Sequence, residues 1–103
     1  MKTQAQIYMD YQNACSQAGS LEQIARNLDN VADSQMQSCL GQVSSHWKGD
    51  NSEAYVRKGR VVQDKIRNTA KDLRNAASAI RRMAKNTYDA EMRALEIAKA
   101  REY

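Results

Sequence analysis

Few side chains in this sequence could take part in catalysis or hold a metal ion. The single histidine, His46, has no cysteine or carboxylate at a spacing that would complete a metal-ligand set. The sequence contains no glycine-rich phosphate loop, nucleophile elbow or Cys-x-x-Cys pair. Asp29 and Asp33 have the i,i+4 spacing of a solvated helix surface rather than of a buried acid–base pair. We therefore predict no active site, no metal and no cofactor.

The two cysteines, Cys15 and Cys39, fall in one predicted helix. At a rise of about 1.5 Å per residue they would lie roughly 36 Å apart, which is beyond the reach of a disulfide within one chain. We expect both thiols to be reduced. A disulfide across an antiparallel dimer is the open alternative.

A turn is predicted near the middle of the chain, at residues 46–50. The stretch contains the only tryptophan, Trp47, and a glycine, Gly49, which can take the φ > 0 conformation that reverses a chain. Asp50 and Glu53 have the spacing of a capping box at the start of a new helix. Trp47 has two compatible interpretations: its indole can close the end of a core, and one edge can contact a receptor.

Both sides of this turn carry apolar and small residues at alternating steps of four and three, as in a heptad repeat. The pattern predicts one helix over about 4–45 and a second over about 51–100. On the first helix the repeat continues from Ala32 to Cys39. The main seam residues expected in the core or in a dimer are Leu21, Leu28, Val62, Ile66, Leu73 and Ile80.

The fold class that follows is all-α, with one domain over residues 1–103. Two long helices joined by a short turn form an antiparallel helical hairpin. Each helix has an apolar stripe wider than one neighbour can cover, and a two-helix layer buries little apolar surface. We therefore expect the hairpin to pair into a four-helix-bundle dimer, with a second copy or with another helical protein.

The charge is distributed unevenly along the chain. Residues 1–51 carry three Lys or Arg against five Asp or Glu, a net charge of −2, and residues 52–103 carry thirteen against seven, a net charge of +6. Acidic residues interrupt every basic cluster, which favours a solvated helix face, and aromatic residues do not alternate with basic ones as in a nucleic-acid-binding surface. No apolar run is long enough to span a membrane. The N-terminal residues lack a signal-peptide core, so we expect a cytosolic protein or export that reads no N-terminal signal.

Trp47-Lys48-Gly49 between two long helices, in a chain of 103 residues, resembles the WXG family. These are the early-secreted-antigen-like substrates of type VII secretion in Gram-positive bacteria and mycobacteria. The resemblance covers the whole chain and implies a helical-hairpin dimer, exported folded by a membrane ATPase, without catalytic activity. It assigns Trp47 and Gly49 to the secretion motif.

The family, or its partner subunit, commonly carries Tyr-x-x-x-Asp/Glu just after the bundle. Here Tyr88 is followed four residues later by Met92. The resemblance therefore implies that Tyr88, Asp89 and Glu91 form a variant signal, or that the partner supplies the regular one.

The expected function is a secreted protein, with a cytoplasmic pool before export, that is exported by a type VII (ESX-type) system or targets a partner to it. Its partners would be the secretion ATPase and a second copy, another small WXG-like protein or the helical domain of a toxin. One alternative is a cytosolic chaperone or targeting subunit for such a toxin. A more distant one is a membrane-active amphipathic protein, suggested by the basic second helix and the wide apolar stripe.

Overall fold

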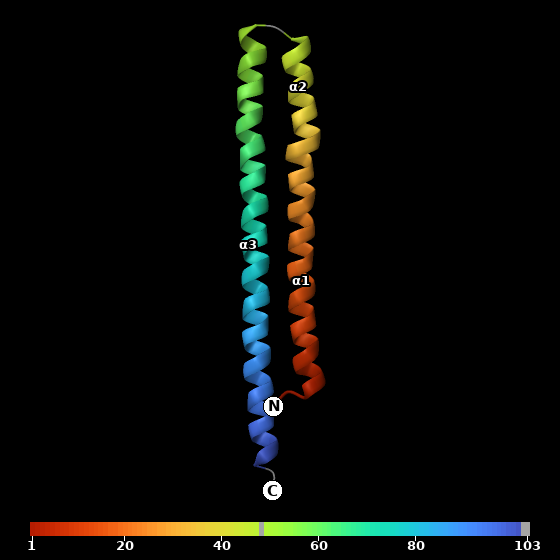
Figure 1. The fold of residues 1–103 in the computed structure, drawn as a ribbon, viewed down its shortest axis with the longest axis vertical. Helices are drawn as coiled ribbons and strands as arrows, with labels where there is room; N and C mark the ends of the chain where they lie inside the picture. Colours follow the sequence, from red (N-terminus) through yellow and green to blue (C-terminus); the bar gives the residue numbers. More distant parts are fainter. Residues whose placement is uncertain (48, 102–103) are drawn as a thin grey trace. The chain divides into compact units, whose positions relative to one another are not determined.

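The computed structural model describes residues 1–47 and 49–101, and every regular element in this part of the chain is helical. The elements are α1 (Gln4–Asn30), a π-helical turn η1 (Val31–Met36), α2 (Gln37–His46) and α3 (Asp50–Ala100) (Figure 1). The predicted all-α class is confirmed. The expected bounds of 4–45 and 51–100 each agree with the observed ends to within one residue.

Helix α1 begins at a capping box that our sequence analysis missed. The Thr3 hydroxyl oxygen accepts a hydrogen bond from the Gln6 backbone N–H at 3.2 Å, and the Gln6 side-chain oxygen accepts one from the Thr3 N–H at 2.9 Å. This reciprocal pair satisfies two donors that the first helical turn leaves free. The signal, Thr-x-x-Gln, is present in the sequence just before the first heptad.

The π-helical turn η1 is the main departure from the expected helix. Ala18, Ala25 and Ala32 are buried at steps of seven, but the next buried residue is Leu40, eight positions after Ala32. Cys39, which the heptad pattern placed in the seam, is exposed. That expectation was wrong because a π turn contains more residues per turn than an α turn, and so it shifts the phase of everything that follows.

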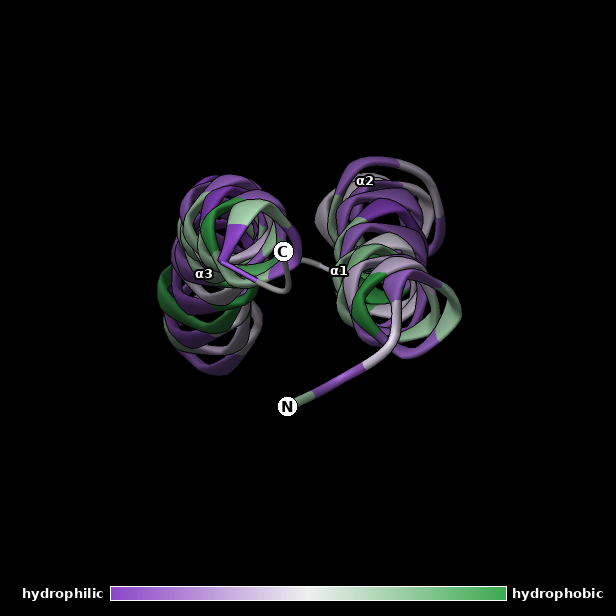
Figure 2. Ribbon diagram, turned by 90° about the horizontal axis from the view of Figure 1, so that it is seen from below, coloured by the Kyte–Doolittle hydropathy of each residue, from purple (hydrophilic) through white to green (hydrophobic). Residues whose placement is uncertain are grey.

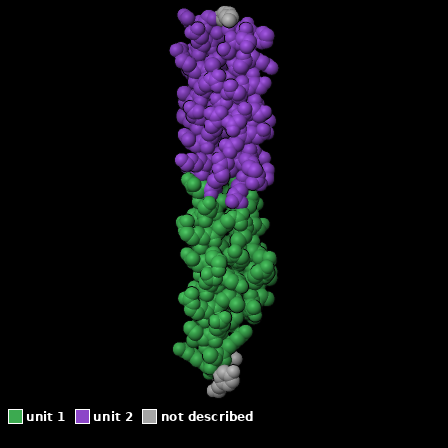
Figure 3. Space-filling view, in the orientation of Figure 1, with its two compact units in different colours: residues 1–21, 75–103 green, residues 22–74 purple. Residues whose placement is uncertain are grey.

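The chain forms two compact units, which Figure 3 shows in different colours. The first comprises residues 1–21 and 75–103, and the second comprises residues 22–74. Helix α3 contributes to both. The expectation of a single domain over residues 1–103 stays a prediction.

In the unit 22–74, two helical segments lie side by side and run in opposite directions. As residue numbers rise along α3, the numbers of their partners fall: Arg60 bonds to Gln37, and Arg74 bonds to Asp29. In the unit 1–21/75–103, Lys2 contacts Glu91, and the Tyr11 and Tyr88 rings lie 5.2 Å apart. In each unit, residues far apart in the sequence therefore come together.

The interior of these segments consists mostly of alanine. Fully buried alanines are Ala18, Ala25, Ala32, Ala70 and Ala77. Small side chains allow two helix backbones to approach closely, but each buries little apolar area. Hydrophilic residues occupy much of both helical ribbons, as their hydropathy colouring shows (Figure 2). Apolar burial in either unit is correspondingly thin.

Candidate recognition site at the turn

The end of α2 presents Trp47 in an extended conformation, with φ −112° and ψ 132°. Its backbone N–H still donates to the Val43 carbonyl at 3.0 Å, so the helix ends at His46 and the chain leaves it directly afterwards. The side chain is 65% exposed. Trp47 therefore does not close the end of a core within this chain, contrary to one of its two expected roles.

Gly49 takes a φ of 120°, which confirms the predicted positive-φ glycine in the turn. No atom lies within 4 Å of where its Cβ would be. The glycine is thus required by backbone conformation rather than by crowding. Lys48, between these two residues, lies outside the described part of the chain.

The start of α3 is capped differently from our expectation. Asp50 is already the first residue of α3, and the Glu53 N–H donates to the Gly49 carbonyl at 3.2 Å. The predicted Asp50–Glu53 capping box was wrong because Gly49, not Asp50, accepts the first helical hydrogen bond. Both acids still lie in the first turn, where negative charge is favourable next to the helix dipole.

Ser52 ties the turn to the first turn of α3. It is buried, and its hydroxyl donates to the Gly49 carbonyl at 2.8 Å, with the Trp47 carbonyl at 3.3 Å as a second acceptor. A hollow of about 400 Å³ lies beside this turn, with Trp47, Ser44 and Val56 in its lining. The Ser52 hydroxyl therefore links the Trp47 and Gly49 carbonyls to the first turn of α3.

The three residues of the variant C-terminal signal have partners of their own within the unit 1–21/75–103. Half-buried Tyr88 packs at a tilt of 48° against the Tyr11 ring. Asp89 accepts hydrogen bonds from the Lys85 ammonium at 2.8 and 3.0 Å, and Glu91 lies 3.2 Å from Lys2. Tyr88 and Glu91 line one hollow of about 240 Å³, whereas Asp89 is not part of its lining, and Tyr88 packs as part of the helix contact.

Ion pairs in this unit raise the pKa values of two lysines, Lys2 and Lys85. Hydrogen bonds to Asp10 and then Glu91 raise the pKa of Lys2, and the hydrogen bond to Asp89 raises the pKa of Lys85. The pKa of Tyr11 is raised, first by a hydrogen bond with Cys15 and then by charge repulsion from that side chain. These shifts arise from local pairing at the surface and do not assemble an acid–base centre.

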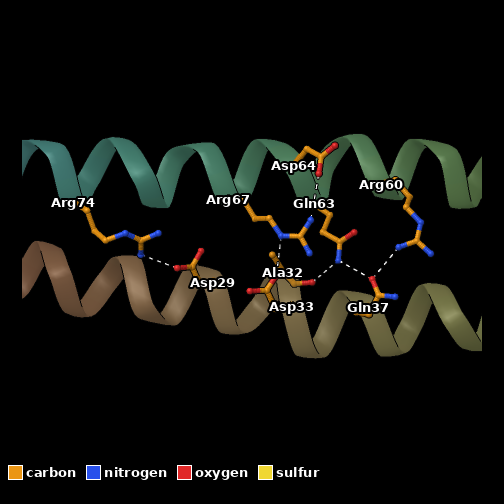
Figure 4. Close-up of polar contacts among 9 residues, drawn as sticks. All are labelled: Asp29, Ala32, Asp33, Gln37, Arg60, Gln63, Asp64, Arg67 and Arg74. Atoms are coloured by element: carbon orange, nitrogen blue, oxygen red, sulfur yellow. Dashed lines mark hydrogen bonds and ion pairs between the residues drawn. The ribbon is translucent and has the colours of Figure 1, made fainter.

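The unit 22–74 contains a polar network that our sequence analysis did not foresee (Figure 4). Gln63 is 1% exposed, and its amide donates to the Ala32 carbonyl at 2.6 Å and to the Gln37 side-chain oxygen at 3.0 Å. The same Gln37 oxygen accepts from Arg60 at 2.8 Å. Gln63 occupies the same heptad position as two buried alanines, Ala70 and Ala77, and the heptad pattern gives no signal that an amide is buried there.

Ion pairs continue this network along one edge of the unit. Arg67 lies 2.7 Å from Asp33, and Arg74 lies 2.7 Å from Asp29. The pair with Asp33 raises the pKa of Arg67. Arg60, Arg67 and Arg74 recur every seven residues, so they occupy one line of α3. Exposed pairs contribute little stability, but a row of them favours one register. Three of the basic side chains of α3 thus contact residues of α1, η1 and α2.

The expected seam residues divide into two groups. Half-buried residues are Leu21, Leu28, Ile66, Leu73 and Ile80. Val62, in contrast, is 47% exposed, so it lies outside the core of the chain, and its place in a dimer seam stays a prediction. The fully buried positions of α3 lie one residue further along, at Gln63 and Ala70, because the helix is turned slightly relative to the predicted stripe.

An apolar hollow of about 460 Å³ lies on the surface of the unit 22–74. Its lining consists of Met36, Cys39, Leu40, Tyr55, Lys58, Gly59 and Val62. Tyr55 and Val62 are spaced by seven residues and are both exposed. On α3 this line lies about 140° from the arginine line, as five residues separate Val62 from Arg67. One side of the unit is therefore closed by ion pairs and another presents uncovered apolar groups.

Within residues 1–47 and 49–101, no group of three or more His, Cys, Asp or Glu side chains is placed to hold a metal ion. Over the same residues, none of the helices combines the length and apolar character needed to cross a membrane. Both cysteines are free thiols. No protein-family model, curated protein or solved structure matches this chain.

Proposed function

We propose that this chain is a non-enzymatic interaction protein of the WXG type, exported by a type VII secretion system or targeting a partner to it. One observation carries the proposal: the only tryptophan of the chain is 65% exposed between two helical segments. A large exposed indole is costly to keep in water, and tryptophan is the residue most enriched in binding hot spots. Its place in a Trp-x-Gly turn supports recognition by a secretion ATPase.

The proposal assigns recognition to Trp47 rather than to the C-terminal tyrosine motif. Tyr88, Asp89 and Glu91 are engaged by Tyr11, Lys85 and Lys2. A receptor would have to break these contacts before reading the three side chains together. We propose that a complete tyrosine signal, where export requires one, comes from the partner chain.

The active form, in our proposal, is a helical hairpin over the whole chain that pairs into a four-helix bundle. Support comes from the apolar hollow around Leu40 and Gly59 and from the exposed Tyr55 and Val62 beside it. In the other unit, Met83 and Ile97 are also exposed. The partner is a second copy or another helical chain, including the helical domain of a toxin.

The test compares Trp47→Leu with the parent in the producing organism, with and without the secretion ATPase. We expect Trp47→Leu to keep its helicity and oligomeric state but to lose export into the culture supernatant. The lost indole contact should reduce export by about tenfold or more, as expected for a binding hot spot. Tyr8→Leu is the matched control, because Tyr8 is also an exposed aromatic residue of a helical segment.

Two results would argue against this function. Export of the Trp47→Leu protein at the parent level would leave the indole without a role in recognition. Equal appearance of the parent in the supernatant with and without the ATPase would remove the secretion system from the proposal. Circular dichroism and light scattering on both variants separate a recognition defect from misfolding.

A further inference from the structure

The π-helical turn η1 makes two registers available to the segment that follows it. With η1 in place, Leu40 is buried and Cys39 is exposed. If residues 31–36 were α-helical instead, the seven-residue repeat through Ala25 and Ala32 would bring Cys39 into the seam and turn Leu40 outward. The two registers differ by one residue, which is a rotation of about 100°.

Gln63 makes contacts that belong to the π register. The Gln63 amide donates to the Ala32 carbonyl at 2.6 Å, and its second N–H donates to the Gln37 side-chain oxygen at 3.0 Å. Ala32 lies near the start of η1, and Gln37 follows its end. An α-helical turn would rotate Gln37 by about 100° relative to Ala32, so the two acceptors would no longer face Gln63 together.

Leu40 is complementary to α3 in this register alone. It is 3% exposed, and its side chain lies against Gly59, where an added Cβ would overlap with the Leu40 methyl groups. With Cys39 in the same place, the smaller side chain would leave the space opposite Gly59 unfilled. Packing at Gly59 and hydrogen bonding at Gln63 therefore favour the same register.

We propose that Gln63 is a positioning residue that selects the π register of η1 and so fixes the rotation of α2. Because α2 ends at His46, its rotation sets the direction in which Trp47 leaves the helix. The effect of this rotation on recognition of Trp47 rests on the proposed function. The selection of the π register by Gln63 does not depend on that function.

The experiment is a double-mutant cycle between Gln63→Leu and deletion of Ser34 in the full-length chain. Deleting this exposed residue places Leu40 seven positions after Ala32, so an unbroken α helix keeps Leu40 on Gly59 and needs no donor from Gln63. In the parent, Gln63→Leu should lower the folding equilibrium constant by about tenfold, the effect of one lost buried hydrogen bond. In the deletion background the same substitution should cause a smaller loss, because the Ala32 carbonyl then accepts the Gln37 N–H as in an ordinary α turn and only the bond to the Gln37 side chain is lost.

The Cys39 thiol gives a second readout, measured with a thiol reagent in a Cys15→Ser background. In the parent and in both deletion variants, Cys39 should react rapidly, because Leu40 occupies the seam. In Gln63→Leu without the deletion, the α register should become populated and the Cys39 reaction should slow by about tenfold. Gln42→Leu, an exposed glutamine of α2, is the matched control and should leave the rate unchanged.

An equal loss of stability from Gln63→Leu in both backgrounds would overturn the proposal, because Gln63 would then not act through the π turn. An unchanged Cys39 reaction rate in Gln63→Leu would overturn it as well. If Gln63→Leu does not fold, Gln63→Ala takes its place, since alanine occupies the equivalent buried positions 70 and 77. These outcomes are independent of export, so the proposed function can fail while the register selection stands.

Discussion

Tyr11 shows how a single contact changes the ionisation of a side chain in this chain. The hydrogen bond with Cys15, followed by repulsion from the same side chain, raises the pKa of Tyr11 above its ordinary value. The folded chain therefore binds this proton more tightly than the unfolded chain does. The associated stability is complete below the ordinary tyrosine pKa and is lost as the pH rises through the pKa of the folded state.

We expect one tyrosine to titrate late when the absorbance of tyrosinate is followed from pH 9 upward. Tyr11→Phe should remove this late component, and Cys15→Ala should move it to lower pH, because both the hydrogen bond and the charge are lost. Tyr8→Phe is the control and should leave the late component in place. If Cys15→Ala does not change the titration, Cys15 is not the cause of the shift.

Single residues also show what the sequence could and could not reveal. Gly49 was predictable, because glycine takes a positive φ at little cost where a chain must turn between two helices. Gln63 was not, since the heptad pattern offers no reason to bury an amide among alanines. Its partner is the backbone carbonyl of Ala32, which lies in a π turn that the pattern also missed.

At the scale of elements, helix bounds were accurate because Pro is absent and the turn signals are concentrated at residues 46–50. The phase of α2 was not predicted, because a π turn is set by tertiary contacts such as Leu40 on Gly59 and leaves no local signature. The buried line of α3 was displaced by one residue for a similar reason. Which edge of a wide apolar stripe is covered depends on the neighbouring helix.

Two glycines with equally open surroundings should respond to substitution in opposite directions. Neither Gly41 in α2 nor Gly49 in the turn has an atom within 4 Å of its added Cβ. Gly41→Ala should raise the free energy of unfolding by about 0.5–1 kcal/mol, because alanine is favoured in a helix interior. Gly49→Ala should lower it by about 1–2 kcal/mol, because its φ is 120°.

Urea denaturation followed by circular dichroism measures both changes. A higher free energy of unfolding for Gly49→Ala would show that the turn does not need a positive φ in solution. A lower free energy of unfolding for Gly41→Ala would show that this face of α2 is covered in the assembled protein, since the added methyl group would then contact a neighbour.

For the molecule as a whole, the buried alanines and the uncovered apolar hollow have the same cause, because the helix contacts cover little of the apolar surface. Alanine contacts bring two helical segments together but remove little apolar surface from water. Tyr55 and Val62 remain exposed next to a hollow of about 460 Å³. The width of the apolar stripe in the sequence predicted that some apolar surface would stay uncovered. It did not predict which residues would be exposed.

Two adjacent valines allow the proposed dimer to be tested without disturbing the fold. Val61 and Val62 are 53% and 47% exposed. They point about 100° apart on α3, and of the two valines only Val62 lines the apolar hollow. Val62→Asp should raise the dissociation constant of the dimer by about tenfold or more, because pairing would bury an unpaired carboxylate. Val61→Asp should leave it near the parent value. Light scattering and sedimentation at micromolar concentration measure the difference, and equal behaviour of the two variants would place the dimer contact elsewhere.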